Sequence, residues 1–189
     1  MATTYKVGYF VGSLAKESIN RKLAHALVKL APPDLSLTEI PFKDLPLYSY
    51  DYDADFPQVA KDFKQAIADV DALLFVTPEY NRSIPGGLKN AIDWASRPYG
   101  KNSFTGKPSG IIGTSPGAIG TAIAQASLRG VLCFCNSPLM NTVEAYIHYT
   151  PGLFTDDGEV TNESTKKFLT NYMNEYHAFV IRVEKAFAP

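Results

Sequence analysis

The chain is predicted to form an open parallel β-sheet covered by helices on both faces, which places it in the α/β fold class. Strand-like and helix-like segments alternate along all 189 residues, as parallel strands joined by helical crossovers require. Residues 72–77 form a continuous apolar run, which is typical of a central strand buried on both faces. The length suits one domain and no linker or repeat interrupts it, so residues 1–189 are expected to form a single domain.

The first half of the chain shows this alternation clearly. Residues 5–11 are apolar and aromatic and end at a Gly-Ser turn, and apolar side chains then recur on one helical face over residues 19–30. Pro32-Pro33 ends that helix. Residues 35–40 alternate like a strand, whereas residues 41–56 are rich in proline, tyrosine and aspartate, which predicts a long surface loop.

The second half repeats the pattern. Apolar residues at spacings of three and four predict a helix over residues 59–70, directly before the apolar strand at 72–77. Two helices and two strands are then expected in alternation, over residues 86–97, 109–114, 121–134 and within 138–146. A long amphipathic helix from residue 163 closes the fold.

Composition excludes several functional classes. The chain has 18 basic and 19 acidic residues, and this balance argues against a general nucleic-acid binder and, mildly, against an acidic electron carrier. No apolar run approaches the length of a membrane span, so no membrane partner is expected. The N-terminus leads straight into a strand-like segment without a signal-peptide pattern, so a cytoplasmic location is the default expectation.

No metal site is expected. The three histidines lack ligand partners at useful spacings, and the aspartates of residues 51–55 lack the glycine and glutamate of an EF-hand loop. Cys133 and Cys135 do not have the Cys-x-x-Cys spacing of a redox motif. We therefore expect them to be small hydrophobic residues of the core.

The loop after the first strand is a candidate anion site. Sheets of this kind bind ligands beyond the carboxyl ends of their strands, where the strand order reverses. Gly12 permits a tight turn, Ser13 and Ser18 supply hydroxyls, and Lys16 supplies a charge beside the N-terminus of the following helix. A phosphate group could be held there. A helix cap by Ser18 or Asn20 is an equal alternative.

The loop after the third strand is the most specific stretch. Prolines at 78 and 85 restrict the backbone at both ends, and Gly86-Gly87 permits close approach of a ring or of another backbone. A rigid loop with exposed amides over residues 79–81 suits the edge of an isoalloxazine ring, which needs N–H donors when it is reduced. The alternative is a proline-rich turn with a capping glutamate.

These stretches resemble the NAD(P)H-dependent FMN reductase family, especially its quinone and chromate reductase branch. The resemblance lies in Thr-Pro-Glu-Tyr-Asn at 77–81, in Ser-Ile-Pro-Gly-Gly-Leu-Lys-Asn-Ala-Ile-Asp-Trp at 83–94, and in the loops at 12–20 and 113–120. It covers nearly the whole chain and implies a flavodoxin-like fold, with strand order 2-1-3-4-5 and FMN at the strand ends. One departure is Ala15, where the family usually has arginine; Lys16 could replace that charge only as a point charge.

The resemblance implies that bound FMN contacts three loops. The residues assigned to the phosphate side are Ser13, Lys16, Ser18, Ile19 and Asn20. Those assigned to the ring side are Pro78, Glu79, Tyr80, Asn81 and Ser115. Arg82 and Arg97 are candidates for binding the nicotinamide dinucleotide or an anionic substrate, and solvated surface arginines are the equal alternative.

The implied activity is that of an NAD(P)H-dependent oxidoreductase in which the flavin carries the chemistry, so no side chain is assigned as catalytic. Our hypothesis is a ping-pong reaction, in which NAD(P)H passes a hydride to bound FMN and an acceptor then takes its place. Acceptors of the family include quinones, free flavin, azo dyes and metal oxyanions. A homodimer or a tetramer is expected, with the second loop and its helix at the interface. The alternative function is a one-electron carrier of the flavodoxin type.

Overall fold

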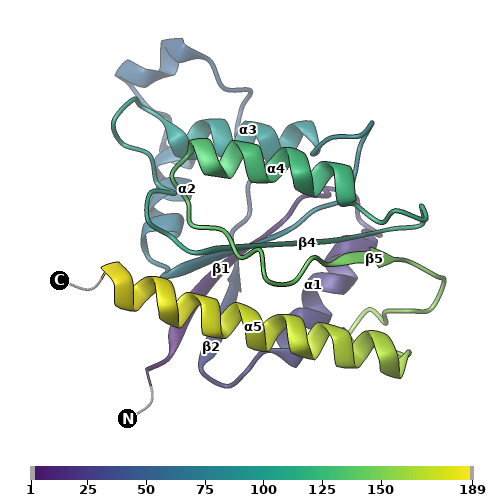
Figure 1. Ribbon diagram of the computed structural model, residues 1–189. Coiled ribbons are helices and arrows are strands. Elements are labelled where there is room, and N and C mark those ends of the chain that lie inside the picture. The colour runs from purple at the N-terminus through teal and green to yellow at the C-terminus, as the bar shows by residue number, and fades with distance from the viewer. Residues whose placement is uncertain (1–2, 188–189) are drawn as a thin grey trace.

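In the computed structural model, which describes residues 3–187, five parallel strands form one sheet in the order β2-β1-β3-β4-β5 (Figure 1). The strands are β1 (Tyr5–Val11), β2 (Leu35–Glu39), β3 (Ala72–Val76), β4 (Ser109–Ser115) and β5 (Tyr146–His148). This order confirms the predicted flavodoxin-like fold. Residues 1–2 and 188–189, the ends of the expected single domain, lie outside the described residues.

Helices cover both faces of the sheet (Figure 1). One face carries α1 (Ile19–Leu30) and α5 (Glu163–Phe187), and the other carries α2 (Gln58–Ala68), α3 (Gly86–Ser96) and α4 (Ala122–Phe134). Consecutive residues of β3 serve the two faces in turn: Leu73 and Phe75 pack under α2 to α4, and Leu74 and Val76 pack under α1 and α5. The uninterrupted apolar run of β3 follows from this burial on both sides.

The last strand lies later than predicted. The expected segment 138–146 overlaps β5 only at Tyr146. The chain does run beside β4 from Pro138, whose carbonyl accepts from Ser109 N–H at 2.8 Å, and Leu139 forms a bridge with Ser109. The pairing then breaks, and just before β5 the carbonyl of Ala145 accepts from the Gln125 side chain at 2.8 Å. The edge strand is thus interrupted, and its regular part begins at Tyr146.

Residues 41–56 cross the surface as predicted, but they are well anchored. They include a short 3-10 helix, η1 (Tyr50–Ala54). The Pro46 carbonyl accepts from Trp94 Nε1 at 2.7 Å and from Asn90 Nδ2 at 2.9 Å. Trp94 is completely buried, so the indole both packs beneath this loop and ties it to α3.

The expectation for the cysteines is half right. Cys135 is buried, as a core residue should be, but Cys133 is exposed on α4. Neighbours at i and i+2 point to different sides of a helix, so an apolar sequence run cannot place both in the core.

Within residues 3–187, no helix combines the length and the apolar character that crossing a membrane requires.

The tightest packing at the carboxyl end of the sheet occurs at Gly113 of β4. A methyl group there would overlap the Thr77 carbonyl oxygen and the Thr121 hydroxyl. We expect Gly113→Ala to lower the free energy of unfolding by about 3 kcal/mol, because neither neighbour can withdraw. Thermal and urea unfolding of the apoprotein measure this change.

Gly130, in the middle of α4, is the matched control. No atom lies within 4 Å of the methyl group that alanine would add there. Gly130→Ala should therefore raise the free energy of unfolding by roughly 0.5–1 kcal/mol through helix propensity. A Gly113→Ala protein that unfolds at the wild-type midpoint would contradict the close packing described here.

Candidate functional site

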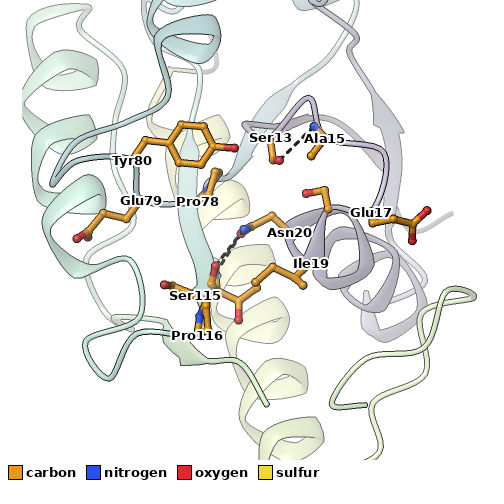
Figure 2. A pocket seen from close by; sticks show the side chains of 12 residues that line it. Ser13, Ala15, Glu17, Ile19, Asn20, Pro78, Glu79, Tyr80, Ser115 and Pro116 are labelled. Atoms are coloured by element: carbon orange, nitrogen blue, oxygen red, sulfur yellow. Dashed lines mark hydrogen bonds between the residues drawn. The ribbon is translucent and has the colours of Figure 1, made fainter. Parts of the chain in front are cut away.

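The carboxyl ends of three neighbouring strands meet at one edge of the sheet. Val11 of β1 pairs with Val76 of β3, which pairs with Ile112 of β4, so the loops that follow these strands start side by side. Figure 2 shows that their side chains converge on a hollow, whose volume is about 220 Å³. The residues that line it are Ser13, Ala15, Glu17, Ser18, Ile19, Asn20, Pro78, Glu79, Tyr80, Thr114, Ser115 and Pro116.

The first loop brings two hydroxyls to the start of α1. The Ser18 side chain caps the helix by accepting from Arg21 N–H at 3.3 Å, and Ser13 Oγ accepts from Ala15 N–H at 3.4 Å. Both serines are only 5% exposed. The predicted cap is therefore present, yet each hydroxyl keeps its own hydrogen for donation. The first-turn N–H groups of α1 and the positive end of its dipole lie at the same place.

Asn20 ties the first loop to the third. Its Nδ2 donates to the Thr114 carbonyl at 3.0 Å, and its Oδ1 accepts from Thr114 N–H at 3.0 Å. The side chain is 1% exposed. The sequence prediction treated this amide as a phosphate ligand. In the structure it instead holds the end of β4 against α1, although its backbone N–H still belongs to the helix N-terminus.

The second loop contains a tight two-residue hairpin. Tyr80 and Ser83 exchange backbone hydrogen bonds of 2.9 and 3.0 Å, and the residues between them have positive φ, 51° for Asn81 and 63° for Arg82. This is the geometry of a type I′ turn. Tyr80 is half exposed and its ring points toward Ser13 (Figure 2). Asn81, at the tip of the turn, is not among the residues that line the hollow.

The Glu79 side chain points away from the hollow and caps α4 (Figure 2). Its Oε2 accepts from the N–H groups of Ile123 at 3.0 Å and Ala124 at 3.1 Å, and its Oε1 accepts from Arg82 at 2.9 Å. The alternative interpretation of this loop, a turn with a capping glutamate, is thus correct for the side chain. The backbone of Glu79 still borders the hollow.

The charges around the first loop differ from those predicted. Lys16 is exposed and does not line the hollow, whereas Ala15 and Glu17 do. Sequence reasoning did not assign Glu17 to the site. Its position directly before the capping residue Ser18 was the signal that could have placed it there. The side chain of Glu17 extends outward at the rim (Figure 2). This end of the hollow therefore depends on hydroxyls, amides and the helix dipole for positive potential.

The third loop completes the rim. Ser115, as predicted, lines the hollow, and its Oγ accepts from Gly117 N–H at 3.1 Å. Thr114 and Pro116 also border it, and sequence reasoning had assigned neither. The imidazole Nδ1 of His148 lies 3.2 Å from the Gly117 carbonyl oxygen, so β5 supports this turn from the side.

The two arginines proposed for substrate binding have other partners. Arg97 is outside the hollow: its Nη2 donates to Asp53 at 2.7 Å and its Nε to the Tyr48 hydroxyl at 2.8 Å. The Tyr48 hydrogen bond and Asp53 raise the pKa of Arg97. This arginine holds the 41–56 loop, and substrate binding by its side chain stays a prediction. Arg82 is 67% exposed and pairs with Glu79.

Comparison with known proteins gives a consistent picture. The model of a family described as NADPH-dependent FMN reductase matches residues 5–152. A 2-hydroxy-1,4-benzoquinone reductase from Burkholderia sp. is 55% identical over 93% of this chain and 96% of its own length. A quinone reductase from Pseudomonas putida is 47% identical over 95% of this chain and 97% of its own length.

A solved structure agrees with these relatives. FerB, a flavoenzyme NAD(P)H:(acceptor) oxidoreductase from Paracoccus denitrificans, has a TM-score of 0.91 and 45% sequence identity over 95% of this chain and 98% of its own. The match to the family model takes in β1 to β5 and hence all three loops of the hollow. The chain belongs to the NADPH-dependent FMN reductase family.

Proposed function

We propose that this enzyme uses FMN, held in the hollow between the three loops, to pass electrons from NAD(P)H to quinones and free flavin. The observation that carries the proposal is the convergence of the three loops on the N-terminus of α1. A phosphate needs many donors, and here hydroxyls and helix amides face it together. Relatives named as quinone reductases support the choice of acceptor.

The lining residues fit the two ends of FMN. At the phosphate end, the hydroxyls of Ser13 and Ser18 and the backbone N–H groups of Ile19 and Asn20 would hold the anion, with Lys16 nearby in solvent. At the ring end, Pro78 and Tyr80 supply flat apolar surface. The backbone N–H groups of Glu79 and Asn81, together with Ser115, would face the polar edge of the ring, since the Tyr80 N–H is already bonded to the Ser83 carbonyl. We propose the whole chain as one FMN-binding domain.

Bound FMN supplies the two-electron chemistry that moves a hydride from NAD(P)H to an acceptor. The protein's contribution is to bind and orient FMN. The N-terminus of α1 would anchor the phosphate, and the Pro78–Tyr80 segment would limit the tilt of the ring. Tyr80 is half exposed, so the ring end opens to solvent. Donor and acceptor would enter by this opening in turn, which gives a ping-pong reaction. Azo dyes and metal oxyanions are further proposed acceptors.

Anaerobic reduction tests this function. The purified protein, loaded with FMN, is expected to lose its visible absorbance within one turnover of added NADPH or NADH and to regain it when benzoquinone is added. Initial rates at several fixed quinone concentrations should give parallel double-reciprocal lines, because donor and acceptor share one opening. Stopped-flow and steady-state absorbance provide the measurements.

Two outcomes would overturn the proposal. A protein that takes up no FMN lacks the proposed cofactor site. A protein that binds FMN and is reduced in two separate one-electron steps, with slow reaction toward quinones, would instead be a carrier of the flavodoxin type. Free FMN without protein, treated with the same nicotinamide, is the control.

The charge pattern of the first loop gives a second test. Ala15 lines the hollow without supplying charge, and Glu17 adds a negative charge at the rim. Ala15→Arg should lower the Kd for FMN about tenfold, since a guanidinium can bind phosphate in a bidentate way. Quenching of FMN fluorescence measures the Kd. Gln65→Arg, on the exposed face of α2, is the matched control and should leave it unchanged. An Ala15→Arg Kd equal to that of wild type would contradict phosphate binding at this end.

We further propose a homodimer, or a tetramer built from it, with the second loop and α3 at the interface. An apolar hollow of about 420 Å³ runs between α3 and α4, and Phe134 at its end is 93% exposed. Exposed apolar surface of this kind is typical of interfaces. Light scattering should give at least twice the mass of the chain, and a monomer at micromolar concentration would contradict it.

A further inference from the structure

We infer that the Glu79 carboxylate is a positioning group: it fixes the second loop against the third, and through the loop amides it sets the affinity and reduction potential of the bound flavin. The inference rests on the proposed function, because it concerns the same hollow. It goes beyond that function because it assigns control of the flavin's affinity and reduction potential to a side chain that points away from the hollow (Figure 2).

The carboxylate is fully engaged by protein groups. Its side chain is 7% exposed, and it accepts three hydrogen bonds, two from the amides of Ile123 and Ala124 and one from Arg82. The bonds of 2.9 to 3.1 Å have the usual length for N–H donors. A nearly buried carboxylate with three donors is held in one orientation, so the backbone of Glu79 is held with it.

The hairpin beside Glu79 depends on this support. Asn81 and Arg82 both have φ in the left-handed region, which is unfavourable for an arginine and persists only where surrounding contacts impose it. Glu79 stands directly before the hairpin, and its bond to Arg82 closes across the turn. The carboxylate thus restrains the segment whose backbone N–H groups, at Glu79 and Asn81, would face the flavin.

The same carboxylate stabilises the start of α4. Thr121, the N-cap residue of α4, makes no side-chain cap, and the first turn of the helix contains no acidic residue. Glu79 supplies both the missing acceptor and a negative charge at the positive end of the helix dipole. The third loop, which leads into α4, is therefore fixed by a residue of the second.

The negative charge of Glu79 is balanced by groups around it. The negative charge of Glu79 is offset by the α4 dipole and by Arg82, so it does not oppose negative charge developing in the hollow. Without the carboxylate, the backbone N–H groups of Glu79 and Asn81 would lose their fixed orientation. Since such donors act most strongly on the reduced anion, affinity for reduced FMN should fall more than affinity for oxidised FMN. The reduction potential would then become more negative.

Three variants test this inference, with all measurements made at low temperature to favour the folded state. Glu79→Ala removes the cap and the ion pair, Glu79→Gln keeps the shape of the side chain, and Asn162→Ala is the control. Asn162 caps α5 by accepting from Thr165 N–H at 2.9 Å, so its loss also removes a helix cap. Fluorescence titration gives the Kd for FMN, dye equilibration gives the potential, and circular dichroism gives the melting temperature.

Glu79→Ala is expected to raise the Kd for FMN about tenfold and to shift the potential to more negative values, with a smaller change of the same sign in Glu79→Gln. Asn162→Ala should lower the melting temperature and leave both flavin properties at wild-type values. If Glu79→Ala does not fold, the Kd for FMN and the reduction potential of Glu79→Gln alone test the inference.

Flavin properties that stay at wild-type values in the folded Glu79 variants would overturn the inference while leaving the proposed function intact. Wild-type protein that binds no FMN would overturn both.

Discussion

The reciprocal pair of hydrogen bonds between Asn20 and Thr114 is the contact on which the site depends. It joins the first turn of α1 to the end of β4, 94 residues later in the chain. Both bonds are buried, where a lost partner would leave a polar group unpaired. The amide therefore fixes how far apart the first and third loops stand. The hollow between them has its shape because this distance is fixed.

The second loop is held in place by a different kind of hydrogen bond. Glu79 reaches α4 with a charged acceptor, whereas Asn20 reaches β4 with a neutral amide. Gly113 lets β4 and the Thr77 backbone approach closely enough for both contacts to form. The third loop is thus the common partner. Asn20 and Glu79 both line the hollow, but their side chains bind other parts of the chain.

Apolar periodicity predicted the five α-helices of the described residues, and the resemblance to the FMN reductase family implied the strand order that the sheet shows. Sequence reasoning also located the three loops. It did not predict which groups the side chains of Asn20, Glu79 and Arg97 contact, because these partners lie far away in the sequence. A capping glutamate in the second loop was the alternative interpretation, but the sequence did not identify α4 as the helix that it caps. The interrupted pairing before β5 was hidden for the same reason, since the carbonyl of Ala145 binds a side chain of α4.

The long separation between the partners of these contacts also bears on how the protein folds. The first loop is complete once residue 20 has been made, but its partner Thr114 and the α4 amides that bind Glu79 come some hundred residues later. Contacts of this range form after local structure, because closing a long loop costs entropy. A nascent chain that emerges in order would therefore carry β1, α1 and β3 before its three loops can come together. Completion of the hollow is then one of the last events in the folding of the chain.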